Sequence, residues 1–131
     1  MKTRRLFLKS FSSVPLFFAF NQTGKANNTT KPILLNQCSI AGFQYYQGKE
    51  ILSELKQNEP LVLAAEPDNQ YDEFAVAIYY QTKKLGYIPR NENKSISRLL
   101  QAGVTLNARV YAVDMNNNSW NAVQVAVYMQ V

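Results

Sequence analysis

Residues 61–89 read LVLAAEPDNQYDEFAVAIYYQTKKLGYIP, and this stretch decides the fold. The continuous apolar run at 61–65 is typical of a short buried strand. A second β-favouring run follows at 75–80 and a third at 85–89, separated by the polar residues 81–84. A polar connection this short between two strands favours a hairpin. The stretch therefore predicts antiparallel strands.

Toward the N-terminus, residues 33–46 are apolar and β-favouring, and they predict a long first strand. Gly42 lies inside this run, where a glycine indicates a bulge or a close approach of another part of the backbone. Leu52 and Leu55 are three residues apart within the stretch 50–55. This spacing predicts one short helical turn that acts as a lid or plug.

Toward the C-terminus, the hydrophobic period changes. Ile96, Leu99 and Leu100 follow the i, i+3, i+4 spacing, which predicts one amphipathic helix of roughly ten residues. Asn91 or Asn93 is available as the N-cap of this helix. Its apolar stripe must cover an open face or end of the sheet.

Two further strands are predicted at 105–115 and 120–131, joined by an asparagine-rich turn. Five to six short strands, one inserted amphipathic helix and a short helical turn predict a mainly β protein. The expected architecture is a small, partly open β-barrel of the OB or SH3-like kind. Such barrels serve as binding scaffolds more often than as enzymes.

The charge of the chain is divided unevenly. The 131 residues carry a net charge of +5, but residues 1–31 hold six of the cations and no acid. Residues 32–131 hold eight cations against nine acids, which is a net charge of −1. The folded part therefore cannot attract polyanions by bulk charge, and a nucleic-acid contact requires a local cluster and base stacking.

The chain has no histidine and one cysteine. This composition excludes the usual zinc sites, a Cys-His or Ser-His nucleophile pair and an intramolecular disulfide. We interpret Cys38 as a small strand residue, and the alternative is a reactive thiol. No cofactor is predicted.

Residues 3–9 read TRRLFLK, and a modestly apolar run of about ten residues follows them. Together they resemble a bacterial twin-arginine export signal, whose machinery would engage residues 3–9; the alternative is a chance arginine pair at a basic terminus. The resemblance predicts an export signal at 1–26, a flexible linker at 27–32 and a folded domain at 33–131. The protein would be periplasmic, either released by cleavage after Ala26 or tethered by an uncleaved leader. The apolar run is too short for a stable membrane span.

Three segments carry a family resemblance: AGFQYYQG at 41–48, EPDNQYD at 66–72 together with the strand before it, and KLGYIP at 84–89. In this order and with these separations they resemble the HIRAN domain, over about residues 38–131. The resemblance implies an OB-like barrel that is a non-enzymatic binding module. In its helicase-associated eukaryotic members, this domain grips the 3′-hydroxyl end of single-stranded DNA.

The resemblance also implies a set of nucleic-acid-binding residues, namely Tyr45, Tyr46, Asn69, Tyr71, Asp72, Arg90 and Trp120. Tyr45 and Tyr71 match the base-stacking positions. Asp72 matches the acceptor of the terminal hydroxyl, which would repel a terminal phosphate. Asn69 supports the same pocket, and Arg90 falls where the family has a basic residue that holds a phosphate oxygen. Trp120 falls where the family uses an aromatic late in the barrel.

Each of these residues also has a purely structural interpretation. Tyr45 and Tyr46, as neighbours in a strand, would point to opposite faces of the sheet, which would bury one of them. Asp72 could serve only the backbone amides of its own turn. Trp120 could plug one end of the barrel, and Arg90 could be a solvated charge.

Two positions depart from the DNA-binding relatives: Gln44 stands where they have an arginine and Tyr87 where they have a histidine. A second hypothesis is that export has redirected the groove to a peptide or a cell-envelope glycan, with the tyrosines stacking on side chains or sugar rings. A third is a small metal-dependent nuclease that uses Asp72 and the neighbouring acids of residues 66–73 around a hard cation.

Overall fold

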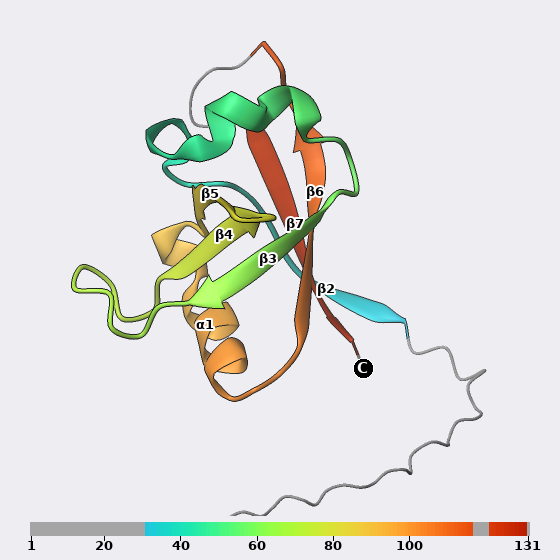
Figure 1. The fold of residues 1–131 in the computed structure, drawn as a ribbon. Helices are drawn as coiled ribbons and strands as arrows, with labels where there is room; N and C mark the ends of the chain where they lie inside the picture. The colour runs from blue at the N-terminus through green and yellow to red at the C-terminus, as the bar shows by residue number, and fades with distance from the viewer. Residues whose placement is uncertain (1–30, 117–120, 131) are drawn as a thin grey trace, which may run out of the picture. The chain divides into compact units, whose positions relative to one another are not determined.

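The computed structural model describes residues 31–116 and 121–130. In this part the chain forms an antiparallel sheet of six strands (Figure 1). The strands are β2 (Pro32–Ser39), β3 (Pro60–Ala65), β4 (Val76–Tyr80), β5 (Lys83–Tyr87), β6 (Leu106–Val113) and β7 (Val123–Gln130). Their order across the sheet is β2-β7-β6-β3-β4-β5. The predicted mainly β architecture is confirmed.

The strand β3 joins the two halves of the sheet. Pro60 and Leu61 pair with β6, whereas residues 62–65 pair with β4. The sheet is not closed into a barrel, which departs from the predicted partly open barrel. Among the described residues, one isolated bridge joins the segment after β2 to β5: Ala41 and Tyr87 exchange two backbone hydrogen bonds of 2.8 and 3.0 Å. Closure stops there because the chain turns away immediately after Ala41.

The hydrophobic core follows the alternation of the strands. On β7, Val123, Val125 and Val127 are buried, as the period of two requires. Ile96 of α1 (Lys94–Gln101) and the segments between strands complete the core. Its largest members outside β6 and β7 include Ile40, Phe43, Ile51, Ile78, Leu85 and Ile88.

Cys38 lies in β2 and is buried in this core. Burial is the main cause that raises the pKa of its thiol to about 12, and the charge of Glu92 adds to the effect. The thiolate is therefore scarce at neutral pH. The interpretation of Cys38 as a small strand residue is confirmed.

The first strand is shorter than predicted. β2 ends at Ser39, and the chain turns through Gly42, whose φ of 73° is in the left-handed region. Two 3-10 helical segments follow, η3 (Phe43–Tyr45) and η4 (Gln47–Glu54), drawn in teal to green at the top of Figure 1. The expected short helical turn is present within η4, but the prediction of a strand through Tyr46 is wrong.

The reason for this error is the burial of one aromatic ring. Phe43 is almost completely buried, and Gly48 packs directly against its ring, where a Cβ would lie 2.1 Å from a ring carbon. A buried apolar residue in a helical segment is the same kind of residue as a buried apolar residue in a strand. Local pattern alone therefore cannot separate the two.

The amphipathic helix is confirmed. α1 begins after Asn93 and buries Ile96 and Ser97 against the sheet. At its C-terminal end the backbone N–H of Gly103, with a φ of 88°, donates to the carbonyl of Leu100 at 3.0 Å. Asn93 stands at the N-cap position, but its side chain makes no capping hydrogen bond.

Some predictions fall on other parts of the chain. The export signal at 1–26 and Trp120 lie outside the described residues. Within residues 31–116 and 121–130, no helix is long and apolar enough to cross a membrane.

Candidate functional site

The loop between β3 and β4 is organised by the side chain of Asn69. Its Oδ1 accepts hydrogen bonds from the backbone N–H groups of Tyr71 at 2.8 Å and Asp72 at 3.1 Å. Its Nδ2 donates to Oε1 of Glu66 at 3.0 Å. Asparagine commonly stabilises turns in this way. The consequence here is that the Tyr71 ring is held outward, with 78% of the residue exposed.

Asp72 is fixed by contacts from three directions. Its Oδ1 accepts from the backbone N–H of Phe74 at 2.9 Å, and its Oδ2 accepts from Nδ2 of Asn93 at 2.8 Å. Nε of Arg90 lies 3.8 Å from the same Oδ2. The hydrogen bond from Asn93 is the largest cause that lowers the pKa of Asp72, followed by the bond from Phe74. The carboxyl group is therefore ionised at neutral pH.

Arg90 connects the carboxylate of Asp72 to the backbone of the β3-β4 loop at Tyr71. Its Nη2 donates to the carbonyl oxygen of Tyr71 at 2.9 Å. The side chain is 78% exposed. A guanidinium has five N–H donors, so most of them remain available to a ligand.

These residues line one groove of about 380 Å³. The lining residues are Ala41, Tyr46, Asn69, Tyr71, Asp72, Ala75, Tyr87, Ile88, Arg90 and Asn93. The structure thus brings together five of the seven residues that the sequence predicted. A second hollow of about 520 Å³ lies along the same loop and shares Asn69, Tyr71, Asp72, Arg90 and Asn93 with the first.

The paired tyrosines do not have the predicted arrangement. Tyr45 is 71% exposed and Tyr46 is 38% exposed, so neither is a core residue. The alternation argument fails because the two tyrosines do not lie in a strand: Tyr45 ends η3, and Tyr46 is the residue between η3 and η4. Tyr46 lines the groove and contacts Tyr87 edge-on, with ring centroids 5.9 Å apart, whereas Tyr45 is not among the lining residues.

The structure adds a polar cluster of Lys84, Tyr87 and Glu66 that the sequence did not indicate. Nζ of Lys84 donates to the Tyr87 hydroxyl at 2.6 Å, and this hydroxyl donates to Oε1 of Glu66 at 3.0 Å. Nζ also lies 3.7 Å from Oε2 of Glu66 and 5.0 Å from the ring centroid of Tyr46. No spacing in the sequence predicts this cluster, because its residues meet only through the β3-β4-β5 pairing.

The cluster governs the charge of Glu66. Partial burial opposes ionisation, but hydrogen bonds from Asn69 and Tyr87 and the charge of Lys84 together lower the pKa of this carboxyl group. Asn93 also lines the groove, although the sequence did not predict it as a site residue. Its asparagine type suggested a helix cap, whereas its buried amide contacts Asp72.

Two ion pairs lie beside the groove, Lys84 with Glu66 and Arg90 with Asp72. In the described ranges, no three histidine, cysteine or acidic side chains come together as a metal-ligand group, and this includes the acids of residues 66–73. The metal-dependent nuclease hypothesis lacks the cluster that it requires.

Gln44 is one of the two positions that differ from the DNA-binding relatives, and it lies in η3. Its Oε1 is buried and accepts no hydrogen bond from the described residues. Tyr87 is the other such position, where the relatives have a histidine. Its hydroxyl is hydrogen-bonded to Lys84 and Glu66, as described above.

An open, β-rich domain with a groove lined by tyrosine and amide side chains is typical of small protein domains that bind ligands. The model of the HIRAN domain family matches residues 34–131, and the chain belongs to this family. HIRAN domains are binding modules known for holding the 3′ end of single-stranded DNA.

Solved structures show the same fold. A crystal structure of a protein from Lactobacillus plantarum is 24% identical, with a TM-score of 0.68, and the match covers 77% of this chain and 97% of that chain. The crystal structure of the HIRAN domain of human HLTF is 16% identical, with a TM-score of 0.57, and the match covers 76% of this chain and 80% of that chain. No curated protein matches the chain significantly.

Proposed function

We propose that this chain is a non-enzymatic module that holds the 3′-hydroxyl end of single-stranded DNA in the groove of about 380 Å³. The observation that carries this proposal is the placement of Tyr46, Tyr71 and Asp72 around one groove in a HIRAN domain. The groove offers flat aromatic surface and one acceptor of defined charge, which are the two features that an unpaired terminal nucleotide requires.

The tyrosines supply the stacking energy. Tyr71 is held outward by its loop and is exposed, so a base stacks on its ring without rearrangement of the backbone. Tyr46 lines the same groove and contacts Tyr87 edge-on. Tyr45 does not line the groove but is exposed, and in this proposal its ring offers an additional stacking surface. Each stacked base contributes about 1–3 kcal/mol. Trp120 supplies a further aromatic surface in this proposal.

Asp72 discriminates between chain ends. Its ionised carboxylate accepts a hydrogen bond from a 3′-hydroxyl but repels a 3′-phosphate. Oδ1 has an acceptor position left beside its bond to Phe74. Asn69 and Asn93 keep the carboxylate in place, and Arg90 holds the phosphate that links the last two nucleotides.

The test is fluorescence anisotropy of residues 27–131 with a short labelled strand that ends in a 3′-hydroxyl or a 3′-phosphate. We expect tighter binding of the hydroxyl end, a loss of about tenfold or more for Tyr71→Ala, and a loss of end preference for Asp72→Asn. Asp68→Asn is the matched control, because Asp68 is exposed in the same loop and does not line the groove. Equal binding of both ends, or no binding at low salt, would contradict the proposal.

A second candidate ligand is a peptide or a glycan of the cell envelope. The charge pairs around the groove favour it, because a neutral ligand needs no free cation. With such a ligand, Tyr71→Ala still weakens binding, but affinity changes little between 50 and 200 mM salt, conditions over which nucleic-acid binding falls clearly.

We further propose that residues 1–26 direct the folded domain to the periplasm through the twin-arginine route and stay as a tether where they are not cleaved. The arginine pair Arg4 and Arg5 before an apolar run supports this proposal. A fusion of residues 1–32 to a folded reporter should reach the periplasm, and the double change Arg4→Lys and Arg5→Lys should keep it in the cytoplasm. Equal export of both fusions would remove the support for this route.

A further inference from the structure

A third hollow lies on the strands β6 and β7 and shares no lining residue with the other two. Asn107 and Arg109 of β6 are exposed. Ala108, which lies between them, and Val110, which follows Arg109, are buried. Asn107 pairs directly with Tyr128 of β7. Because side chains alternate along a strand and directly paired residues share a face, Asn107, Arg109 and Tyr128 lie on the same outer face of the sheet.

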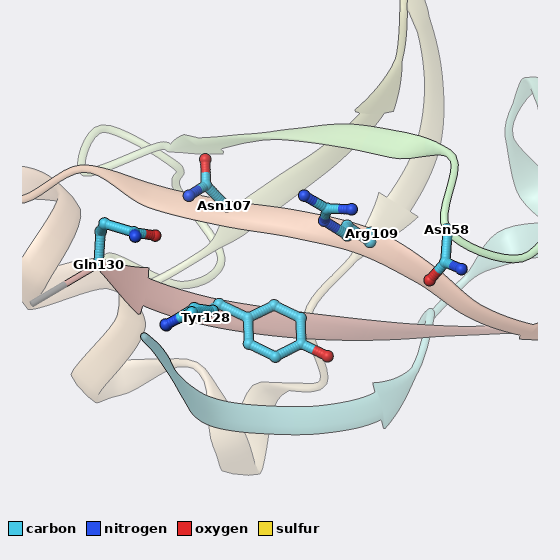
Figure 2. A pocket seen from close by; sticks show the side chains of 6 residues that line it. Asn58, Asn107, Arg109, Tyr128 and Gln130 are labelled. Atoms are coloured by element: carbon cyan, nitrogen blue, oxygen red, sulfur yellow. The ribbon is translucent and has the colours of Figure 1, made fainter. Parts of the chain in front are cut away.

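This face is hollowed to a volume of about 340 Å³. The hollow is lined by Pro32, Asn58, Asn107, Arg109, Tyr128 and Gln130. Figure 2 shows Asn107 and Arg109 on β6 and Tyr128 on β7, with the flat face of the tyrosine ring turned to the viewer. None of these residues lines the groove of the proposed function.

The charge of the hollow differs from that of the groove. Arg109 is the one charged residue in its lining, and no acid balances it. Within the part of the chain that the structure describes, the Arg109 side chain makes no ion pair or hydrogen bond, whereas Lys84 and Arg90 at the groove are both paired. An exposed guanidinium without a partner is complementary to a phosphate oxygen.

We propose that this outer face is a second contact surface for single-stranded nucleic acid, independent of the strand's end. Arg109 holds a backbone phosphate, the Tyr128 ring stacks on an unpaired base, and the amides of Asn58 and Asn107 bond sugar or base edges. An aromatic ring on a sheet reaches only unpaired bases, so the ligand is single-stranded. The proposal rests on the proposed function for the class of ligand, but it uses different residues.

A circular oligonucleotide tests this proposal, because it has no 3′-hydroxyl and cannot use end capture. Residues 32–131 form a compact unit with its own hydrophobic core, so residues 27–131 are used, which also removes the five cations of residues 1–26. Binding of the circular strand at low salt is measured for the wild type, Arg109→Gln and Tyr128→Ser. Lys49→Gln is the matched control, because Lys49 is exposed on η4 and lines none of the three hollows.

We expect Arg109→Gln to weaken binding of the circular strand about threefold to tenfold and to reduce the slope of log K against log salt concentration by about 0.7. Tyr128→Ser should weaken binding without changing that slope, and Lys49→Gln should leave both unchanged. Circular-strand binding that is the same in the wild type and in Arg109→Gln would overturn the proposal.

The outcomes also separate the two proposals. If a linear strand binds by its 3′-hydroxyl and the circular strand does not bind, the outer-face contact is wrong and the proposed function survives. If the circular strand binds through Arg109 and the linear strand shows no end preference, the outer-face contact survives and the proposed function is wrong. If neither strand binds, both proposals fail.

Discussion

At the scale of single residues, Asn93 shows how one buried amide sets the properties of a site. It is 3% exposed, and its Nδ2 donates to the carboxylate of Asp72. This bond and the others at Asp72 lower the pKa of the carboxyl group below its usual value of 3.8. The stabilisation from ionised Asp72 is therefore complete above that value and is lost as the pH falls through the lowered one.

The change Asn93→Asp tests whether the hydrogen bond from Asn93 stabilises the ionised form of Asp72. At pH 7 it places two carboxylates together, and we expect a loss of about 2–4 kcal/mol in the free energy of unfolding. The loss should shrink toward pH 4, because one of the two carboxyl groups then binds a proton and bridges the pair. Urea unfolding at both pH values measures the effect. The control is Asn91→Asp at an exposed position. If Asn93→Asp costs as much stability at pH 4 as at pH 7, repulsion between two carboxylates is not the cause of the loss.

Cys38 gives a second prediction at this scale. Because burial raises the pKa of its thiol to about 12, we expect almost no alkylation by iodoacetamide at pH 8 in the folded protein and complete alkylation in 6 M guanidinium chloride. Mass spectrometry measures both states. Rapid modification of the folded protein would instead favour the reactive-thiol interpretation.

At the scale of elements, the junction between the segment after β2 and β5 depends on Gly86. Its φ is 147°, and an added Cβ would lie 2.4 Å from the carbonyl oxygen of Ala41 and 2.7 Å from Cγ2 of Ile40. Only the fold shows which part of the backbone approaches Gly86 so closely. The bridge between Ala41 and Tyr87 passes at this point, beside the groove.

We therefore expect Gly86→Ala to destabilise the domain by about 2–4 kcal/mol, because both the backbone conformation and the contact with Ala41 oppose a Cβ. The matched control is Gly103→Ala, where φ is 88° but no atom lies within 4 Å of the added Cβ. The control should cost about 1 kcal/mol from backbone strain alone. Equal effects of the two changes on thermal unfolding would show that the close approach contributes nothing.

At the scale of the whole molecule, charge is distributed unevenly between residues 1–31 and the folded domain. Residues 1–31 carry six cations and residues 32–131 carry a net charge of −1. The overall charge of +5 is therefore a poor guide to what the domain binds. Affinity that comes from the cations of residues 1–31 depends on salt, whereas affinity from tyrosine stacking does not.

This separation predicts different salt dependence for the full chain and for residues 27–131. For binding of single-stranded DNA, the slope of log K against log salt concentration should be about −1 to −2 for residues 27–131, and steeper by about 2–3 for the full chain, which has five more cations. Anisotropy titrations between 50 and 200 mM salt measure both slopes. Identical slopes would mean that the cations of residues 1–26 do not contact the strand.

The sequence by itself determined what depends on neighbours along the chain. The alternation on β7, the i, i+3, i+4 spacing of α1 and the asparagine turn at Asn69 each follow from local geometry. The loop that carries Tyr71 and Asp72 is likewise a contiguous stretch of sequence, and its resemblance to the family predicts a site there. The family resemblance also rests on such contiguous segments.

The tertiary structure decided everything that depends on residues far apart in sequence. The open sheet, the 3-10 segment in place of a longer β2, the cluster of Lys84, Tyr87 and Glu66, and the bond from Asn93 to Asp72 all arise from strand order and register. Periodicity records which side of an element is apolar, but it does not record which other element covers that side. The groove exists because packing brings the β3-β4 loop, β5 and the start of α1 to one place.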